Sequence, residues 1–283
     1  MTDWTPAALE QLEAILRQRS GLTFGEARAP FLRNRAREAM ARACFISIPR
    51  WLAEVSRSAE KRGTLYCDLE EALQVHETAF FRYEAHHRAL RDTVLPPLLK
   101  RGGSRVRVVS IGCATGEEAY SLAMTVRECG PRATEMVEIV GLDLSRSALT
   151  QAVAGTYPRG RLESVSSEYQ ARYFLPAGSD RVTVIPALRR MVRFRHHDIR
   201  RGFYLGKFDV IVCCDVLHTF TPAMQAQVLG DLADSLADGG YLFLGPAEGV
   251  TMPGWAFGTD DVLAPFGYRR LGGGPAIAAP SHG

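Results

Sequence analysis

The 283-residue sequence lacks the patterns that would place it in a membrane or around a metal ion. No apolar run approaches the ~20 residues of a transmembrane helix, and no apolar segment near the N-terminus is typical of a signal peptide. The six cysteines include no CxxC pair and the seven histidines no HExxH pattern. We therefore predict neither a disulfide framework nor a metal site. These absences favour a cytoplasmic, globular protein with reduced thiols and no membrane insertion.

The sequence also lacks a strong excess of one charge, although its charge is unevenly distributed. The net charge is +3 at pH 7, yet residues 1–66 hold 11 Lys and Arg against 7 Asp and Glu. Five arginines crowd one predicted helix, namely Arg28, Arg33, Arg35, Arg37 and Arg42. Such a helix either faces solvent or docks onto an acidic partner. Nucleic acid is not expected as that partner, because the overall charge is modest and aromatic residues do not alternate with the arginines.

The chain is expected to contain two domains. Residues 1–75 favour an N-terminal helical domain, residues 76–102 a linker with a connecting helix, and residues 103–271 an α/β domain. The tail over 272–283 is rich in Gly, Pro and Ala, and is predicted to be disordered.

Helix signals in the first domain are local. An apolar face formed by Leu9, Leu12, Ile15 and Leu16 predicts one helix, which Gly21 would cap at its C-terminal end. Pro30 is expected to begin the arginine-rich helix and Pro49 another, because proline is favoured at the first helical position.

From residue 103 onward, segments typical of strands and helices alternate. This order predicts a doubly wound parallel sheet. Thr221 and Pro222 are typical of a helix start, and Asp238-Gly239-Gly240 of a helix end. The expected strands are 105–111, 137–142, 208–214 and 241–245, and the expected helices lie near 117–128, 145–154 and 222–237.

Residues 175–195 interrupt this alternation and are expected to form a small β-subdomain. Apolar and polar residues alternate on both sides of Pro186. The pattern predicts a small antiparallel hairpin inserted in the sheet domain, with Val182, Val184, Val192 and Phe194 on its apolar face.

The segment after the first predicted strand carries the most information. That strand runs into a turn with glycines at 112 and 116, and Glu117 and Glu118 open the following helix. A strand, a glycine turn and a helix start in this order make a nucleotide-binding crevice. The turn lacks the third glycine and the lysine that phosphate-binding loops have.

Charge indicates which ligand the crevice favours. Two carboxylates at a helix start would repel a pyrophosphate but suit a ligand with a cationic end. The second strand ends in Asp143, where it is placed to hydrogen-bond ribose hydroxyls. A ribose-bearing ligand with positive charge suggests S-adenosylmethionine. The alternatives are a structural turn with solvent-facing glutamates, and a nicotinamide oxidoreductase, which the missing third glycine disfavours.

Several linked segments resemble one known family. They are SGLTFGEARAPFLRNR, His76-Glu-Thr-Ala-Phe-Phe-Arg82, GCATGEEAYSLAM, GLDLSRSAL, FDVIVCCDVLHTF and GGYLFLGPAEG. Together they resemble the bacterial chemoreceptor glutamate methyltransferases, the CheR family, over roughly residues 8–250. The resemblance implies an α/β fold: a Rossmann-like class I methyltransferase domain with an inserted small β-subdomain, preceded by a small all-helical domain.

The resemblance also implies the reaction and its partners. S-adenosylmethionine would be the cofactor and S-adenosylhomocysteine the product. The methyl acceptors would be glutamate side chains in the cytoplasmic helical bundle of a chemoreceptor, which the arginine-rich helix would face. We expect the protein to act as a monomer.

A set of site residues follows from the same resemblance. The implied cofactor contacts are His76, Thr78 and Arg82 from the HETAFFR segment, Gly112 and Glu118 at the glycine turn, Asp143 at the ribose, Asp198 and Ile199 beside the adenine, and Cys213 and Cys214 at the methionine end. Arg82 is also the expected catalytic residue, orienting the acceptor carboxylate.

The sequence departs from the family pattern at the fourth strand. Where the family usually reads like CRNVLIYF, this chain has Cys214 for Arg, Asp215 for Asn and Thr219 for Tyr. The first two changes make the cleft two charge units more negative, which favours a sulfonium cation and disfavours an incoming carboxylate. Two classes of function therefore stay open: an active protein-glutamate O-methyltransferase, and a cofactor-binding regulatory or interaction module whose transfer activity is lost or altered.

Overall fold

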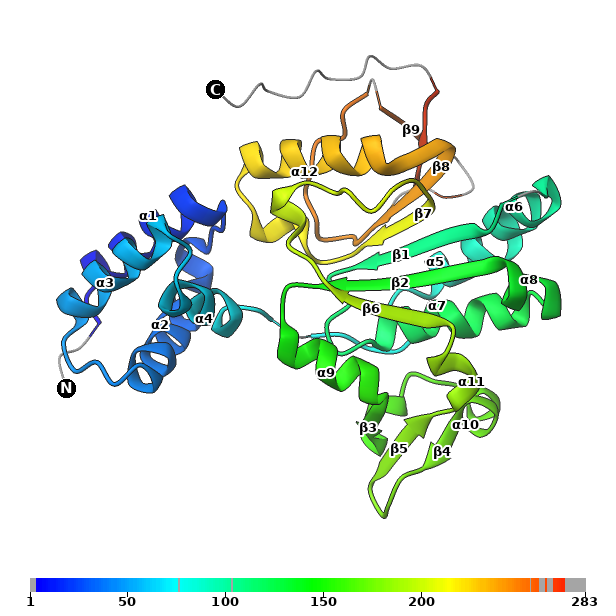
Figure 1. Cartoon of the computed structure of the whole chain (residues 1–283), viewed down its shortest axis with the longest axis horizontal. Coiled ribbons are helices and arrows are strands. Elements are labelled where there is room, and N and C mark those ends of the chain that lie inside the picture. The colour runs from blue at the N-terminus through cyan, green and yellow to red at the C-terminus, as the bar shows by residue number, and fades with distance from the viewer. Residues whose placement is uncertain are drawn as a thin grey trace. The chain divides into compact units, whose positions relative to one another are not determined.

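The computed structural model describes residues 4–75, 77–102, 104–254, 256–259, 263 and 267–272. The chain divides into two units (Figure 1). Residues 1–75 with 218–225 are termed the helical unit, and residues 76–217 with 226–283 the α/β unit. The tail for which disorder is predicted lies outside the described residues, except for Gly272.

Most of the described helical unit consists of helices that bury one apolar stripe each. In α1 the stripe contains Leu9, Leu12 and Leu16. As predicted, Gly21 ends this helix in the left-handed conformation, with φ of 66°. The helices are α1 Pro6–Ser20, α2 Gly25–Arg42, α3 Ile48–Glu60 and α4 Thr64–Ala72.

Residues 218–225 join the helical unit by backbone pairing. Thr23 N donates to Thr219 O over 2.9 Å. A Cβ atom on Gly21 would lie 2.9 Å from Met224 Cβ, so both the turn and the close approach require glycine there. The α/β unit resumes within the helix that begins at Pro222.

Pro30 does not begin α2, contrary to the prediction, because the helix starts at Gly25. The reason is a tertiary cap: Glu13 Oε1 accepts from Phe24 N (3.1 Å) and Gly25 N (3.2 Å). Burial raises the pKa of Glu13, but these hydrogen bonds outweigh it and lower the pKa overall. Pro49 lies in the first turn of α3, as predicted.

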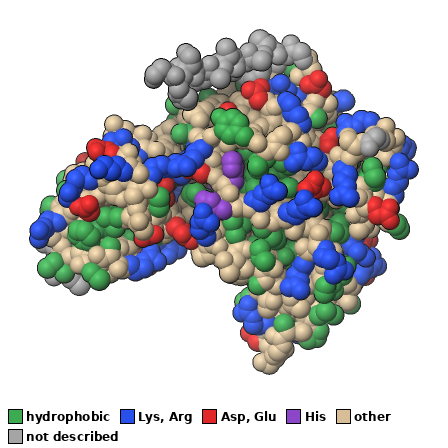
Figure 2. Space-filling view, in the orientation of Figure 1, with side chains coloured by type: hydrophobic (Ala, Val, Ile, Leu, Met, Phe, Trp, Pro, Cys, Tyr) green, Lys and Arg blue, Asp and Glu red, His purple; other side chains and the backbone are tan. Residues whose placement is uncertain are grey.

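The arginines of α2 do not all face solvent in the same way. Arg37 and Arg42 are exposed, whereas the guanidinium groups of Arg28 and Arg35 lie over the ring of Phe31, at 5.5 and 5.4 Å from its centroid. Figure 2 shows basic side chains interspersed with acidic and apolar ones on the visible face of the helical unit. Arg37 and Arg42 are therefore the arginines of α2 that are most accessible to a partner surface.

The α/β unit is built on a seven-stranded sheet in the order β6-β2-β1-β7-β8-β10-β9 (Figure 1). The strands from β6 to β8 are parallel, and β10 runs antiparallel to both β8 and β9. The doubly wound parallel sheet is thus confirmed. Its strands are β1 Val106–Ile111, β2 Val137–Asp143, β6 Val192–His196, β7 Phe208–Cys213, β8 Leu236–Leu244, β9 Phe257–Thr259 and β10 Gly267–Arg270.

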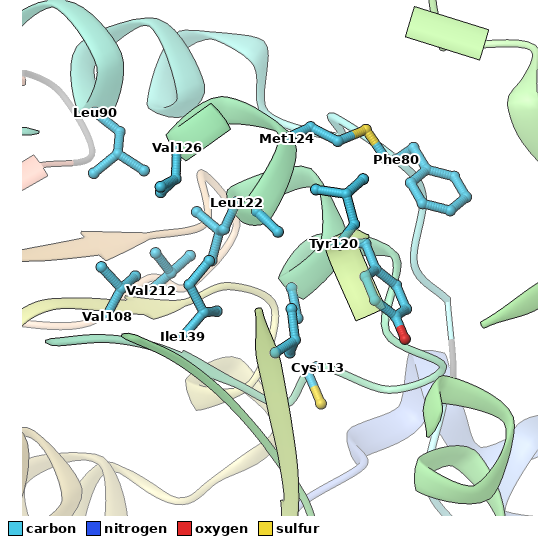
Figure 3. Packing of buried hydrophobic residues seen from close by; sticks show 14 of the residues in the cluster. Phe80, Leu90, Val108, Cys113, Tyr120, Leu122, Met124, Val126, Ile139 and Val212 are labelled. Carbon is cyan, nitrogen blue, oxygen red and sulfur yellow. The ribbon is translucent and has the colours of Figure 1, made fainter. Parts of the chain in front are cut away.

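Helices and apolar strand residues form the core around this sheet. Val108, Ile139 and Val212 pack beneath Leu122 of α7 and Leu90 of η1 (Figure 3). Apart from Arg107 and Glu138, which are half-buried, the alternate residues of the central strands are buried too, as expected for a parallel sheet covered on both faces. The helical segments are α5 Glu84–Ala89, the π-helix η1 Leu90–Val94, α6 Leu95–Arg101, α7 Glu117–Glu128, α8 Pro131–Met136, α9 Arg146–Ala154, η2 Arg159–Leu162, α10 Ser167–Tyr173, α11 Pro186–Arg189, η3 Ile199–Arg201, η4 Leu217–Thr219 and α12 Pro222–Ser235.

The predicted hairpin is wrong, although a small antiparallel sheet exists. That sheet has the order β3-β5-β4, from strands Thr156–Pro158, Arg181–Val184 and Phe174–Pro176. Val192 and Phe194 belong instead to β6, which pairs in parallel with β2. The strand β6 lies at the edge of the main sheet and is partly exposed. Its apolar and polar residues therefore alternate as they would in a half-buried strand of a hairpin.

The end of α12 also differs from the prediction. Pro222 begins the helix, and the Thr221 hydroxyl accepts from Met224 N at 3.5 Å, as expected of an N-cap. The helix ends at Ser235 and β8 follows at once. The pairing register between β7 and β8 shifts between Phe208 and Val210 of β7. Leu236, directly after the helix, is thereby already paired with Phe208.

Phe80 anchors the segment that precedes α5. Its side chain is fully buried and meets the rings of Tyr157 and Phe174 edge-on, at centroid distances of 5.2 and 5.1 Å. Ser164 donates to Phe80 O, and Phe81 N donates to Ser121 Oγ. These contacts fix the backbone next to Arg82.

Replacing Phe80 by Ala should lower the free energy of unfolding by about 3–5 kcal/mol, because it leaves a cavity among packed rings. Urea denaturation measures this loss, and Phe80→Leu, which refills part of the cavity, should lose less. Equal stability of Phe80→Ala and the wild type would show that this segment is not anchored by its core residue.

Candidate functional site

The glycine turn after β1 has the shape that the sequence predicts. Gly112 has φ of 71°, and a Cβ atom there would lie 2.4 Å from Val216 Cγ2. Gly116 has φ of 97°, and a Cβ atom there would lie 2.9 Å from Ala152 Cβ. Both positions therefore require glycine, for conformation and for space.

Asp143 connects this turn to the next strand. It ends β2 and is buried, and its two carboxylate oxygens accept from Ala114 N and Ser145 N, both over 2.8 Å. The side chain thus holds the turns after β1 and β2 together at the carboxyl edge of the sheet. Its contact with a ribose stays a prediction.

The two glutamates at the start of α7 have different surroundings. Thr115 donates to Glu117 Oε2 over 2.6 Å, and Ser110 donates to Glu118 Oε1 over 2.7 Å. Burial raises the pKa of Glu118 to about 7, against the lowering effect of Ser110. Burial also raises the pKa of Glu117. A cationic ligand would relieve this cost by favouring the ionised form.

A pocket within the α/β unit brings five of the predicted residues together. It lies beside the carboxyl ends of β1 and β7, next to the segment 77–83. The predicted residues that line it are Thr78, Arg82, Gly112, Glu118 and Cys214.

The other predicted residues do not line this pocket. Asp198 caps η3 and pairs with Arg200 at 2.7 Å, while Ile199 and Cys213 are buried. Asp143 lies under the glycine turn, as described above. His76 lies outside the described residues.

Three further residues of the pocket form contacts that the sequence does not reveal. Asp215 Oδ2 lies 2.9 Å from Arg82 Nη1 and accepts a 2.6 Å hydrogen bond from the Tyr83 hydroxyl. Burial, together with the bond to Asp215, raises the pKa of Tyr83, so the phenol remains a donor. Cys214 Sγ lies 3.8 Å from His86 Nδ1. Two signals are available in the sequence: Tyr83 follows the HETAFFR segment directly, and Asp215 departs from the family pattern.

The charge of the pocket is mostly negative. Burial lowers the pKa of His86 to about 4, so that it is neutral at pH 7. Among the described residues that line the pocket, Arg82 alone is then cationic. Glu77, Glu118 and Asp215 supply carboxylates around it. This balance suits a cationic ligand better than an anionic one.

Comparison with known proteins identifies the family. The family model for the CheR methyltransferase S-adenosylmethionine-binding domain matches residues 76–257. The chain belongs to the CheR methyltransferase family. This CheR chain therefore binds S-adenosylmethionine, and the predicted cofactor is confirmed. The glycine cradle at Gly112 and the negative pocket fit a ligand that carries a sulfonium cation.

Curated relatives agree with this assignment. The chemotaxis protein methyltransferase of Listeria monocytogenes serovar 1/2a is 34% identical over 201 residues, which cover 71% of this chain and 75% of the relative. Chemotaxis protein methyltransferase 1 of Pseudomonas aeruginosa is 37% identical over 203 residues, covering 69% and 74%.

The fold also resembles that of other methyltransferases, more distantly. The N-methyltransferase NodS of Bradyrhizobium japonicum, solved with S-adenosyl-L-homocysteine, is 19% identical with a TM-score of 0.34, covering 59% of this chain and 63% of that one. A likeness this weak adds nothing to the family assignment. Within the described ranges, no helix combines the length and apolarity needed to cross a membrane.

The raised pKa of Glu118 predicts a pH-dependent loss of stability. Its pKa is about 7 when folded, against an ordinary value of 4.5. Between these values the unfolded chain binds fewer protons than the folded protein, so stability falls as the pH rises and is lowest above about pH 7. Glu118→Gln should remove the part of this pH-dependent loss of stability that comes from Glu118.

Urea unfolding at pH 5 and pH 8 measures the effect. The stability difference between the two pH values should shrink in Glu118→Gln relative to the wild type. Glu163→Gln, at an exposed glutamate, serves as the matched control and should leave the difference unchanged. An identical pH dependence in Glu118→Gln and the wild type would contradict the prediction.

Proposed function

We propose that this CheR-family protein transfers a methyl group from S-adenosylmethionine to glutamate side chains in the cytoplasmic helical bundle of a chemoreceptor. It would act in the cytoplasm, as a monomer. The observation that carries the proposal is the pocket in which Arg82, Gly112 and Glu118 meet inside the matched domain. The names of the relatives, which are chemotaxis protein methyltransferases, support the receptor as the acceptor.

The reaction makes modest demands on the protein. S-adenosylmethionine supplies a methyl group that is already activated by its sulfonium charge. A glutamate carboxyl has an ordinary pKa near ~4.3 and is ionised at pH 7, so no general base is needed. A carboxylate oxygen forms the new bond to the methyl carbon as the carbon–sulfur bond breaks, and neutral S-adenosylhomocysteine leaves. The acceptor must be held in line at about 3–3.5 Å.

We assign roles to the pocket residues on this basis. Arg82, with 39% of its side chain exposed, orients the acceptor carboxylate. Gly112 and Glu118 hold the cofactor, together with Thr78 from the facing segment. The proposed cofactor contacts are completed, as the family resemblance implies, by His76, Asp143, Asp198, Ile199, Cys213 and Cys214.

A second candidate function has one observation in its favour. The guanidinium of Arg82 is already paired with Asp215, where the family pattern has an uncharged Asn. A protein that binds the cofactor without transferring its methyl group to a carboxylate would tolerate this pairing. That protein would be a regulatory or interaction module.

Methyl transfer to receptor fragments distinguishes the two candidates. Labelled S-adenosylmethionine and a chemoreceptor cytoplasmic fragment should give label that alkali releases, as a glutamate methyl ester does. Arg82→Ala should lower kcat/KM by roughly tenfold to a hundredfold, because a hydrogen bond to a charged group contributes about 1.5–3 kcal/mol. Arg88→Ala, at an exposed arginine outside the pocket, is the matched control. Binding of cofactor without any labelled receptor would favour the second candidate.

The exposed arginines of α2 should contribute to receptor binding. Replacing Arg37 and Arg42 by Glu should weaken binding of an acidic receptor fragment, and raised salt should weaken the wild type in the same way. Cofactor affinity should not change. Calorimetry measures both affinities.

Arg57→Glu is the matched control for these substitutions, since Arg57 is an exposed arginine on α3 of the same unit. It should bind the receptor fragment as the wild type does. Equal weakening by Arg57→Glu would mean that only net charge matters, and a loss of cofactor affinity would give α2 a structural role instead.

A further inference from the structure

We propose that Asp215 determines how well the site accepts a carboxylate, because it shares the guanidinium of Arg82 with the incoming acceptor. The inference rests on the proposed function and deepens it. It assigns a specificity role to a residue at which this chain departs from the family pattern.

Two adjacent residues of the segment before α5, Arg82 and Tyr83, fix the Asp215 carboxylate. Asp215 follows β7 with φ of 59°, and its Oδ2 contacts both Arg82 and the Tyr83 hydroxyl. A Cβ atom on Gly245 would lie only 2.9 Å from the Oδ1 atom of Asp215. The absence of a side chain at Gly245 thus leaves room for the carboxylate. A carboxylate that is bound by two side chains and lies close to the backbone at Gly245 has little freedom to move away from Arg82.

Arg82 nevertheless keeps donors for a second carboxylate. Its Nη1 contacts both Asp215 and Glu77 O, each at 2.9 Å. Within the described part of the chain, its Nη2 and Nε have no hydrogen-bond or ion-pair partner, although the guanidinium lies over the Tyr83 ring at 5.5 Å from its centroid. A guanidinium presents five N–H donors in a fixed fork, so an acceptor carboxylate reaches the remaining donors while Asp215 stays in place. Two carboxylates then share one cation.

The described residues that line the pocket provide no second cation beside Arg82. Among the described residues that line the pocket, those near Arg82 are neutral or acidic at pH 7. A carboxylate oxygen of Glu248 lies within 4.8 Å of one of Asp215. Like charges at such distances disfavour a further anion, so Asp215 weakens the binding of a carboxylate acceptor while it favours the sulfonium cation.

The substitution Asp215→Asn tests this role with little change of shape. The amide oxygen still accepts from Tyr83 and Arg82, and only the charge is removed. Binding to the protein loaded with S-adenosylhomocysteine is measured by calorimetry, for a chemoreceptor fragment with Glu at its methylation sites and for the same fragment with Gln there. Asp215→Asn should strengthen binding of the Glu form by roughly tenfold, equivalent to one pKa unit of electrostatic bias, and should leave the Gln form unchanged.

Two control variants separate charge from structure. Tyr83→Phe removes the hydrogen bond to Asp215 but keeps its charge, so it should leave the ratio of the two affinities unchanged. Asp92→Asn breaks another Arg–Asp pair, with Arg91, outside the pocket, and should also leave the ratio unchanged. In steady-state methylation, the gain in Asp215→Asn should appear as a lower KM for the acceptor, with kcat little altered.

The outcomes distinguish this inference from the proposed function. A shift in the Glu-to-Gln affinity ratio supports the role of Asp215 even if neither protein transfers a methyl group, which would contradict the proposed function alone. Equal strengthening of both fragment forms, or none, overturns the inference. Tighter binding of S-adenosylhomocysteine by Asp215→Asn with an unchanged ratio also overturns it, because Arg82 would then serve the carboxylate of the cofactor.

Discussion

The two hydrogen bonds accepted by the Asp143 carboxylate are the interaction on which the site depends. They tie the turn after β1, through Ala114 N, to the turn after β2, through Ser145 N. Ala114 has φ of 44°, a conformation that non-glycine residues rarely adopt and that neighbouring contacts must hold. Hydrogen bonds from backbone N–H groups to a carboxylate are among the stronger hydrogen bonds in proteins. They fix Gly112 and the start of α7, and therefore the place of Glu118 in the pocket.

This arrangement concentrates carboxylates where water is scarce. The N-terminus of α7 favours negative charge, yet the pKa values of Glu117 and Glu118 are raised. Burial therefore outweighs the helix dipole at both positions. A cationic cofactor compensates for this cost, whereas a carboxylate acceptor adds to it. Binding of the acceptor thus depends on Arg82, the cation available among the described lining residues, and on whatever else Arg82 contacts.

The sequence predicted those elements whose signals are local. The order of strand, glycine turn and helix after Val106 is one example. The C-cap of α1 at Gly21 and the position of Pro49 in the first turn of α3 are others. The sequence-based prediction failed where a residue or strand that is distant in sequence determines where an element begins or pairs. Glu13 caps α2 from another helix and moves its start away from Pro30. The strand at Val192 pairs with β2 rather than with its neighbour in sequence, because alternation indicates exposure of one face but not the pairing partner.

The residues of the site show the same contrast between local signals and distant partners. Motif residues in a continuous run line the pocket, as Thr78 and Arg82 do, but the pairing of Arg82 with Asp215 spans more than a hundred residues of sequence. Predictions carried over residue by residue could not show that Asp198 is engaged by Arg200. The pairing of Arg82 with Asp215 depends on packing between segments that are distant in sequence, which no local pattern of a single sequence encodes.

The fourth-strand motif is continuous in sequence but divided in structure, and this separates its departures from the family pattern. Asp215 belongs to the α/β unit and acts on Arg82 through its side chain. Thr219 belongs to the helical unit, where its backbone carbonyl, common to every residue type, accepts from Thr23 N. A change of side chain at position 219 therefore leaves that pairing intact. The electrostatic consequence of the altered motif lies with Cys214 and Asp215, which both line the pocket of the α/β unit, and not with Thr219.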